Sequence, residues 1–357
     1  MLHIGIVRFF ILAFIALMID VSAAETTLRQ SPKKLAEFAE PGSNTPKMLF
    51  SNLPDTVWAN YEQQVGQPLL AWAKREVGYL GGGAVFYPFS GPDFVTIERV
   101  FPNAQRYVMV AIQSARKPAA PETMAAKQRQ AFEKNLSEDW QKFGQLGYFR
   151  TNDLDNDQFD HSSGVGVTTL LMAFAARLGY EVMLAEPLGF NVDRGDWEPR
   201  PSNEQWTSVR LSLRKDGKWV ALDYIKMDLS DNGLKASEPL KTWIKWMSTR
   251  PTLLKAASHL LQKNSFSFLR NSLIEGAPIV IQDETGLEYN DLSKIGSIRL
   301  YGKFTQSHYL FTSTMQHALA AAYKAEKSPK GLPFAFSYLK TAESRSMQIA
   351  DRNVPKK

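Results

Sequence analysis

A strand, a turn, a short helix and a second strand follow one another early in the chain, and this order constrains the fold more than any other feature. Residues 84–87 and 107–112 are apolar runs of strand length. Between them lie turn residues, 88–93, and an apolar stretch, 94–101, long enough for a short helix. A crossover helix between two such strands makes them neighbours in a parallel sheet. The segment therefore predicts a βαβ unit, and Asp93 is placed to cap its helix.

A later segment predicts antiparallel pairing. Apolar residues alternate with polar ones over residues 207–213, and a second strand-like run covers 219–225. Asp216 and Gly217 lie between the two runs, and an Asp-Gly pair in this position is the strongest short-range signal for a β-hairpin. We therefore expect this hairpin to join the sheet.

The remaining patterns predict further helices and strands. Helical spacing of apolar residues is found over 53–77, 122–146, 167–178 and 238–274. Shorter apolar runs predict strands at 182–185, 279–281 and 297–304, whereas 189–205 has the composition of a loop. Alternating strands and helices are typical of the α/β class. We expect a Rossmann-like, mostly parallel sheet with helices on both faces and an appended antiparallel hairpin.

The beginning of the chain has the pattern of a secretory signal peptide. Arg8 precedes an unbroken apolar run, 9–19, and the small residues 21–24 follow. The run is shorter than the roughly 20 residues that a membrane-spanning helix needs. We therefore expect residues 1–24 to be removed, which leaves a periplasmic or secreted bacterial protein with no transmembrane segment.

The rest of the chain divides by composition. Residues 25–50 are polar and rich in Pro and Ser, and predict a flexible lead-in. One α/β domain is expected over 51–323, followed by a Lys/Pro-rich tail over 324–357.

The composition excludes several classes of site. The chain has no Cys, which rules out disulfides, thiolate nucleophiles and Cys-ligated metals. Its net charge is +6, but no dense basic run interleaved with aromatic residues supports nucleic-acid binding. The histidines show no zinc-ligand spacing. We therefore assign no metal, no cofactor and no catalytic residue.

Two turns are similar to those of a family of exported bacterial proteins of unknown function. The first is the Phe-Tyr-Pro-Phe-Ser-Gly-Pro-Asp sequence of residues 86–93, and the second is Ile-Gln-Asp-Glu-Thr-Gly at 281–286. The resemblance implies an exported protein, and that family carries no activity to transfer.

The βαβ segment also resembles the first cofactor-binding unit of Rossmann-like S-adenosylmethionine methyltransferases. In that pattern Tyr87 stands where an acid is expected, Phe89 replaces the first glycine, and Gly91 is kept. Asp93 replaces the last glycine, and Gln113 stands where a carboxylate holds the ribose. The resemblance implies the fold. The lost glycines and acids predict that methyl transfer, which would need the cofactor bound against Phe89, has been lost.

Ligands of open α/β sheets bind at the carboxyl ends of the strands, and several polar residues are expected there. The candidate binding residues are Tyr87, Ser90, Gly91, Asp93, Gln113, Gln282 and Asp283. Our first hypothesis is a non-catalytic module that binds a small molecule or a cell-envelope component at this edge. The alternative is a hydrolase acting on an envelope component through Asp93, Asp283 and His161, with Ser90 as a nucleophile in one version.

An acidic loop offers one further candidate. Asp153, Asp155, Asp157 and Asp160 alternate in a way that can surround a calcium ion. The loop lacks the glycine and the final glutamate of an EF-hand, so a solvated acidic loop is the expectation.

Overall fold

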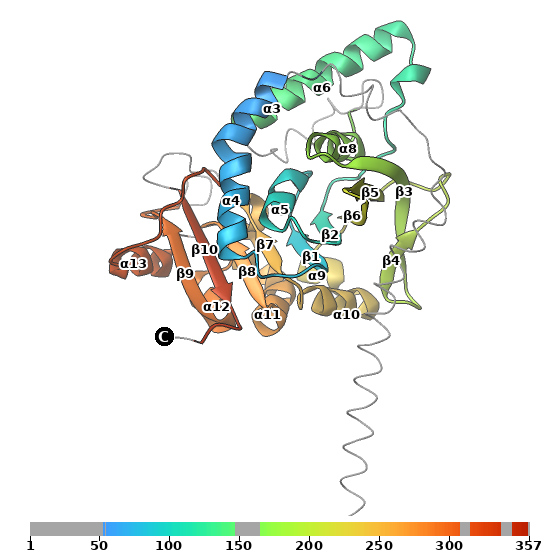
Figure 1. Cartoon of the computed structure of the whole chain (residues 1–357). Helices are drawn as coiled ribbons and strands as arrows, with labels where there is room; N and C mark the ends of the chain where they lie inside the picture. Colours follow the sequence, from blue (N-terminus) through green and yellow to red (C-terminus); the bar gives the residue numbers. More distant parts are fainter. Residues whose placement is uncertain (1–52, 54, 147–164, 308–314, 337–344, 356–357) are drawn as a thin grey trace, which may run out of the picture. The chain divides into compact units, whose positions relative to one another are not determined.

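The computed structural model describes residues 53, 55–146, 165–307, 315–336 and 345–355 (Figure 1). All of them belong to the compact unit Ser43–Lys357, which is separate from the unit Met1–Gly42. The predicted signal peptide and the whole of the predicted lead-in, 25–50, lie outside the described residues. So do the acidic loop at 153–160 and His161.

A ten-stranded mixed sheet forms the centre of the described unit, in the order β4-β3-β5-β6-β2-β1-β7-β8-β10-β9. Its middle is parallel and consists of β6 (Lys218–Lys226), β2 (Arg106–Ala111), β1 (Ala84–Pro88), β7 (Thr252–Leu254) and β8 (Ile279–Gln282). Antiparallel strands continue it on both sides: β5 (Ser208–Lys215), β3 (Glu181–Asn191) and β4 (Asp196–Pro199) beyond β6, and β10 (Ser346–Asp351) and β9 (Ser297–Gly302) beyond β8. The α/β class is therefore confirmed, but the expectation of a mostly parallel sheet holds only for the middle.

Both local motifs predicted from the sequence are present. Strands β1 and β2 pair in parallel with Phe86 opposite Val108, and α5 (Phe94–Val100) crosses between them. Strands β5 and β6 form the antiparallel hairpin, and φ is +50° at Asp216 and +73° at Gly217. Left-handed values at both central residues match the right-handed twist of the two strands, which is why Asp-Gly suits this position.

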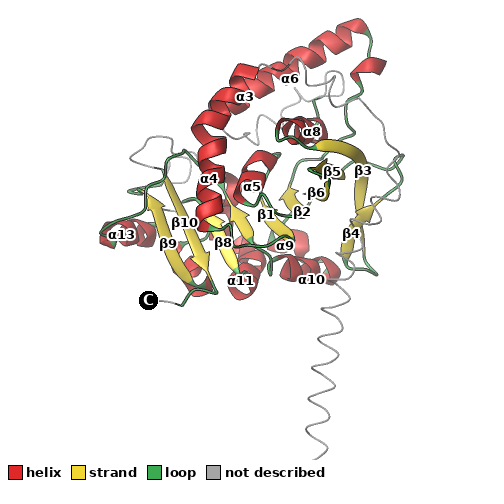
Figure 2. Cartoon of the chain, in the orientation of Figure 1, coloured by secondary structure: helices red, strands yellow, loops and turns green. Residues whose placement is uncertain are grey.

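Helices cover both faces of the sheet (Figure 2). Because successive strand residues point to opposite faces, Tyr87 of β1 belongs to one apolar core and Phe86 to the other. The first core is covered by α3 (Asp55–Tyr61), α4 (Gln67–Glu76), α5, α6 (Ala126–Leu146) and α8 (Val167–Arg177). The second is covered by α9 (Asp231–Leu234), α10 (Glu238–Met247), α11 (Ser267–Gly276) and α12 (Tyr289–Ile295).

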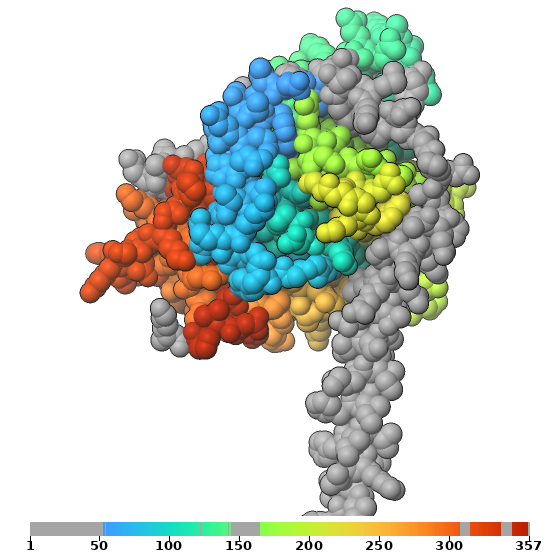
Figure 3. All heavy atoms as spheres, viewed as in Figure 1, coloured from blue at the N-terminus to red at the C-terminus, as the bar shows by residue number. Residues whose placement is uncertain are grey.

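Shorter elements complete the described chain. A π-helix, Glu62–Gly66, joins α3 to α4, and 3₁₀ segments occupy Pro121–Thr123, Ala256–Gln262 and Asn264–Phe266. The last helix, α13 (His317–Ala325), packs beside β9 on a small separate apolar cluster. Figure 3 shows α3 and α4, in blue, covering one face of the unit beside the orange-red C-terminal strands. Within the described residues, no helix combines the length and the apolar character needed to cross a membrane.

Four strands lie wholly or partly where the sequence predicts something else. β7 interrupts the stretch 238–274 that was predicted to be mainly helical, and β3 and β4 extend into the predicted loop 189–205. The fourth is β10, which belongs to the predicted tail 324–357 yet is buried between β8 and β9. Each is short or lacks clear alternation, so its pairing depends on neighbours that are distant in the sequence. The sheet therefore extends beyond residue 323, where the sequence placed the end of the domain.

Candidate functional site

The carboxyl ends of β1 and β7 lie side by side where the winding of the sheet reverses. From β1 the chain crosses to β2 on one side, whereas β7 and its successor β8 lie on the other side. In open α/β sheets a ligand normally binds in the crevice at such a reversal.

A buried ion pair occupies this position here. Lys255 is the first residue after β7, and its Nζ lies 2.7 Å from Oδ2 of Asp93. The exposed fractions of the two side chains are only 3% and 6%. Lys255 Nζ also lies 5.6 Å from the centre of the Phe336 ring. The reversal point is therefore filled by side chains of the protein itself.

The Asp93 carboxylate is satisfied on both oxygens. The Tyr87 hydroxyl donates to Oδ2 at 3.1 Å, and the Thr96 hydroxyl donates to Oδ1 at 2.6 Å. Lys255 Nζ makes a second bond, to the Thr96 oxygen, at 3.1 Å. Asp93 does stand at the N-terminus of α5 as predicted, but its carboxylate caps no backbone amide of that helix. The prediction that Asp93 caps the helix is therefore wrong. Its carboxylate is bonded instead to the side chains of Tyr87, Thr96 and Lys255.

The turn between β1 and α5 has two residues in the left-handed region. Phe89 has φ of +60° and Gly91 has φ of +54°. This region favours glycine, so Phe89 is strained there. Its ring packs edge-on against Phe266, with the ring centres 5.6 Å apart. The Ser90 amide donates to the carbonyl of Val110 at 3.0 Å, so the buried Ser90 fastens the turn to β2.

The two candidates at the end of β8 are also engaged within the protein. Asp283 Oδ1 accepts bonds from the amide and hydroxyl of Thr285, and Oδ2 accepts from the amide of Ala256 at 3.0 Å. Burial raises the pKa of the Asp283 carboxyl, and these bonds only partly oppose it. The Gln282 amide group bonds the backbone of Leu287 in both directions, at 2.9 Å each. Asp283 thereby fastens the turn after β8 to the residue next to Lys255.

The structure thus brings together part of the predicted site. Tyr87 and Asp93 are in direct contact, and Asp283 reaches the same region through Ala256. Gln113 is buried just beyond β2 and is not one of the side chains of the Lys255–Asp93 network described above. His161, which the hydrolase hypothesis requires, lies outside the described residues. Among those that are described, no group of three or more acidic or histidine side chains is arranged to hold a metal ion.

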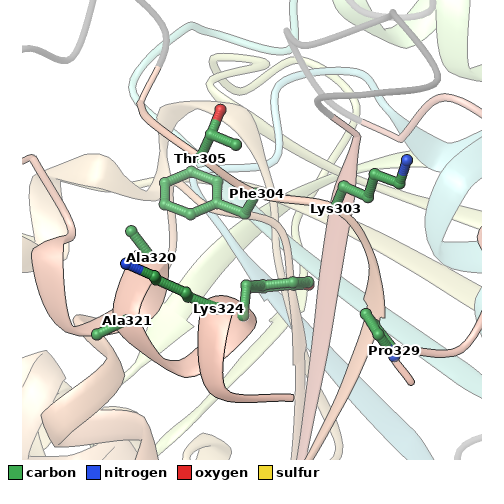
Figure 4. Close-up of a pocket in the computed structure, with 8 residues that line it drawn as sticks. Lys303, Phe304, Thr305, Ala320, Ala321, Lys324 and Pro329 are labelled. Carbon is green, nitrogen blue, oxygen red and sulfur yellow. The ribbon is translucent and has the colours of Figure 1, made fainter. Parts of the chain in front are cut away.

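A pocket of about 470 Å³ lies elsewhere, between the end of β9 and α13 (Figure 4). Its lining comes from three segments of the C-terminal part of the chain: Lys303, Phe304, Thr305, Ala320, Ala321, Tyr323, Lys324 and Pro329. The rings of Phe304 and Tyr323 contact each other, with their centres 6.1 Å apart. The Tyr323 hydroxyl is directed away, donating to the carbonyl of Tyr301 at 2.8 Å, and burial raises its pKa to about 12.

The backbone holds the walls of this pocket in place. The amide of Gly302 donates to the carbonyl of Lys330 at 2.7 Å, and the amide of Lys330 donates to Leu300 at 3.3 Å. These bonds fix Pro329 against β9. Gly302 itself has φ of +76°, and a Cβ there would lie 2.1 Å from the carbonyl oxygen of Arg345. The pocket is therefore built into the fold, as small-molecule sites usually are.

The site residues predicted from the sequence included neither Lys255, the partner of Asp93, nor any residue of the pocket between β9 and α13. Lys255 lies in a stretch with helical spacing, and nothing local marks it as the partner of Asp93. The residues of the pocket run from the end of the predicted strand 297–304 into the predicted tail 324–357, and no prediction joined them. Only the structure ends β9 at Gly302 and places Lys303 and Phe304 directly after the strand, where site residues of α/β sheets gather.

Comparison with protein-family models, with curated proteins and with solved structures gives no match to this chain.

Proposed function

We propose that this chain is an exported, non-catalytic protein that binds a small molecule on a Rossmann-like scaffold, in the pocket between β9 and α13. The observation that carries the proposal is the Lys255–Asp93 pair. It fills the crevice where an enzyme of this architecture would hold its cofactor or substrate. A carboxylate with both oxygens bonded inside the protein is poorly placed to act on a substrate.

The lining of the pocket also favours binding over catalysis. It contains no carboxylate, imidazole or thiol among the described residues, and its one phenol is bonded to the backbone. Acid–base chemistry needs a group that titrates near the working pH within reach of the substrate. Apolar walls with a few polar groups are what a binding site requires.

Export rests on the N-terminal pattern of Arg8, the apolar run 9–19 and the small residues 21–24. Expression in a bacterium and mass spectrometry of the periplasmic protein test this part. We expect a mature N-terminus at Ala24 or Glu25. An intact Met1 on protein recovered from the cytoplasm would contradict export.

A thermal-shift screen of the purified protein against metabolites and cell-envelope fragments tests the binding function. A ligand that binds the native state raises the melting temperature by mass action. Ala321→Trp fills the pocket and is expected to abolish the shift. Ala325→Trp, on the same helix but outside the lining, is the matched control and is expected to keep it.

The variant Asp93→Asn distinguishes binding in the pocket from binding at the edge of the sheet. We expect this variant to melt at a lower temperature but to keep the ligand-induced shift. A shift that is lost in Asp93→Asn and kept in Ala321→Trp would move the site to the edge of the sheet. Turnover of an envelope fragment that Asp93→Asn abolishes would establish the hydrolase alternative instead.

A further inference from the structure

We infer that the ligand of this pocket is an amphiphilic anion, a carboxylate or phosphate head group carried on an apolar body. The inference rests on the proposed binding function and specifies its ligand class. Two features of the described lining carry it: a pair of lysines with no ion pair to any described residue, and an aromatic floor whose phenol is bonded to the backbone.

The two lysines of the lining differ from their neighbour Lys330. Lys303 and Lys324 are exposed and form no ion pair with any residue that the structure describes. The Nζ of Lys330, by contrast, lies 3.0 Å from the Glu76 carboxylate and 5.4 Å from the centre of the Tyr301 ring. No carboxylate belongs to the lining that the structure describes, so two positive charges there lack a counter-ion within it. An anionic ligand supplies one.

The floor of the pocket selects for an apolar body. Phe304 and Tyr323 are buried and belong to an apolar cluster with Leu319. Since the Tyr323 hydroxyl is bonded to the backbone, its ring presents hydrocarbon to the pocket. Ala320 and Ala321 add small apolar surface from the exposed side of α13. A ligand that is polar throughout would leave this surface uncompensated.

One ligand can contact the lysines and the apolar floor of the pocket at the same time. Figure 4 shows the ammonium groups of Lys303 and Lys324 on opposite sides of the Phe304 ring. Both lysines belong to the same lining, so an apolar chain on that ring has cations of the same pocket available to its charged end. Long, flexible lysine stems can lie along an apolar body while the ammonium group meets the charged end. A volume of about 470 Å³ is within the range of small-molecule sites.

Binding of three probes with the same chain length tests the inference. Decanoate is the anion, decanol the neutral analogue and decyltrimethylammonium the cation, all used as monomers and measured by calorimetry. We expect decanoate to bind about tenfold more tightly than decanol, and the cation to bind most weakly. Decyl phosphate should behave like decanoate, whereas inorganic phosphate should not bind, because it lacks the apolar body.

Variants that remove positive charges test whether the two lysines cause the preference for decanoate. Lys303→Gln/Lys324→Gln is expected to lose the preference for decanoate over decanol, and to keep the affinity for decanol. Lys327→Gln removes one positive charge just beyond α13, where the side chain is not part of the described lining. This control should change the decanoate affinity less than about twofold.

The outcomes separate the two proposals. Equal affinity for decanoate and decanol, with both lost in Ala321→Trp, would overturn the inference and leave the binding function standing. If another compound of the screen binds the pocket and no amphiphile does, the inference is likewise overturned and the binding function stands. If no compound shows a shift that Ala321→Trp removes, the binding function fails and the inference fails with it.

Discussion

At the residue scale, the pair formed by Lys255 and Asp93 has a testable energetic consequence. Removing one partner of a buried ion pair leaves the other charge uncompensated, which costs about 3–5 kcal/mol. We therefore expect Asp93→Asn and Lys255→Met each to lower the free energy of unfolding by about that amount, measured by urea denaturation. The double variant should be much less destabilised than the sum of the two, because it leaves no isolated charge.

Lys241→Met is the control for this cycle. It removes a lysine from the pair with Glu238, whose side chain is 81% exposed, so little stability should be lost. Additive effects of Asp93→Asn and Lys255→Met would show that the two charges do not act on each other, and would remove the main support for a filled crevice.

Also at the residue scale, the environment of Glu76 predicts that the stability of the fold depends on pH. Burial opposes its charged form, but bonds from the Tyr301 hydroxyl at 2.5 Å and from Arg75 and Lys330 lower its pKa to about 2. A carboxyl with a lowered pKa stabilises the fold above its ordinary pKa of 4.5, and this contribution is lost as the pH falls towards 2. Glu76→Gln should therefore cost about 2 kcal/mol at pH 7, and the difference from wild type should shrink below pH 4.5.

Urea unfolding at several pH values measures this difference. Glu133→Gln removes an exposed carboxylate of α6 and should change stability by less than about 0.5 kcal/mol. A Glu76→Gln deficit that stays constant down to pH 2 would show that packing rather than charge explains it. The prediction bears on the pocket as well, because Glu76 holds Lys330 beside the wall formed by Pro329.

At the scale of the element, the β5–β6 hairpin depends on its turn residues. Gly217 has φ of +73°, and a Cβ there would contact nothing within 4 Å, so substitution strains only the backbone. Gly217→Ala should lower stability by about 1 kcal/mol. Gly81→Ala is the matched control, since its Cβ is equally free and its φ is not left-handed. Similar melting temperatures for the two variants would contradict the role assigned to the turn.

At the scale of the whole molecule, the C-terminal strand belongs to the main sheet. Ile349 of β10 is fully buried and lies opposite Ile281 of β8 and Arg299 of β9. Ile349→Ala should lower the free energy of unfolding by about 2–4 kcal/mol within a single transition. Val354→Ala, at a position 41% exposed, should have little effect. An unchanged main transition in Ile349→Ala would show that β10 unfolds separately from the rest.

Local patterns in the sequence were sufficient for the βαβ unit and for the hairpin. Alternating or continuous apolar runs and turn residues such as Asp216 and Gly217 act between residues that are close in the chain, so they can be recognised in it. The same reasoning placed Tyr87, Ser90 and Asp93 correctly at the carboxyl end of a parallel strand. The sequence by itself therefore determined the βαβ unit, the hairpin and the position of these three residues.

Only the tertiary structure decided what those residues do. Lys255 reaches Asp93 across 162 positions of the chain, and the three-residue strand β7 that presents it has no pattern of its own. β10 likewise becomes a strand because it completes the hydrogen bonds of β8 and β9. Such pairings depend on burial and on hydrogen bonds between distant segments, and no short-range pattern encodes them. The filled crevice and the pocket beside α13 arise from these long-range pairings.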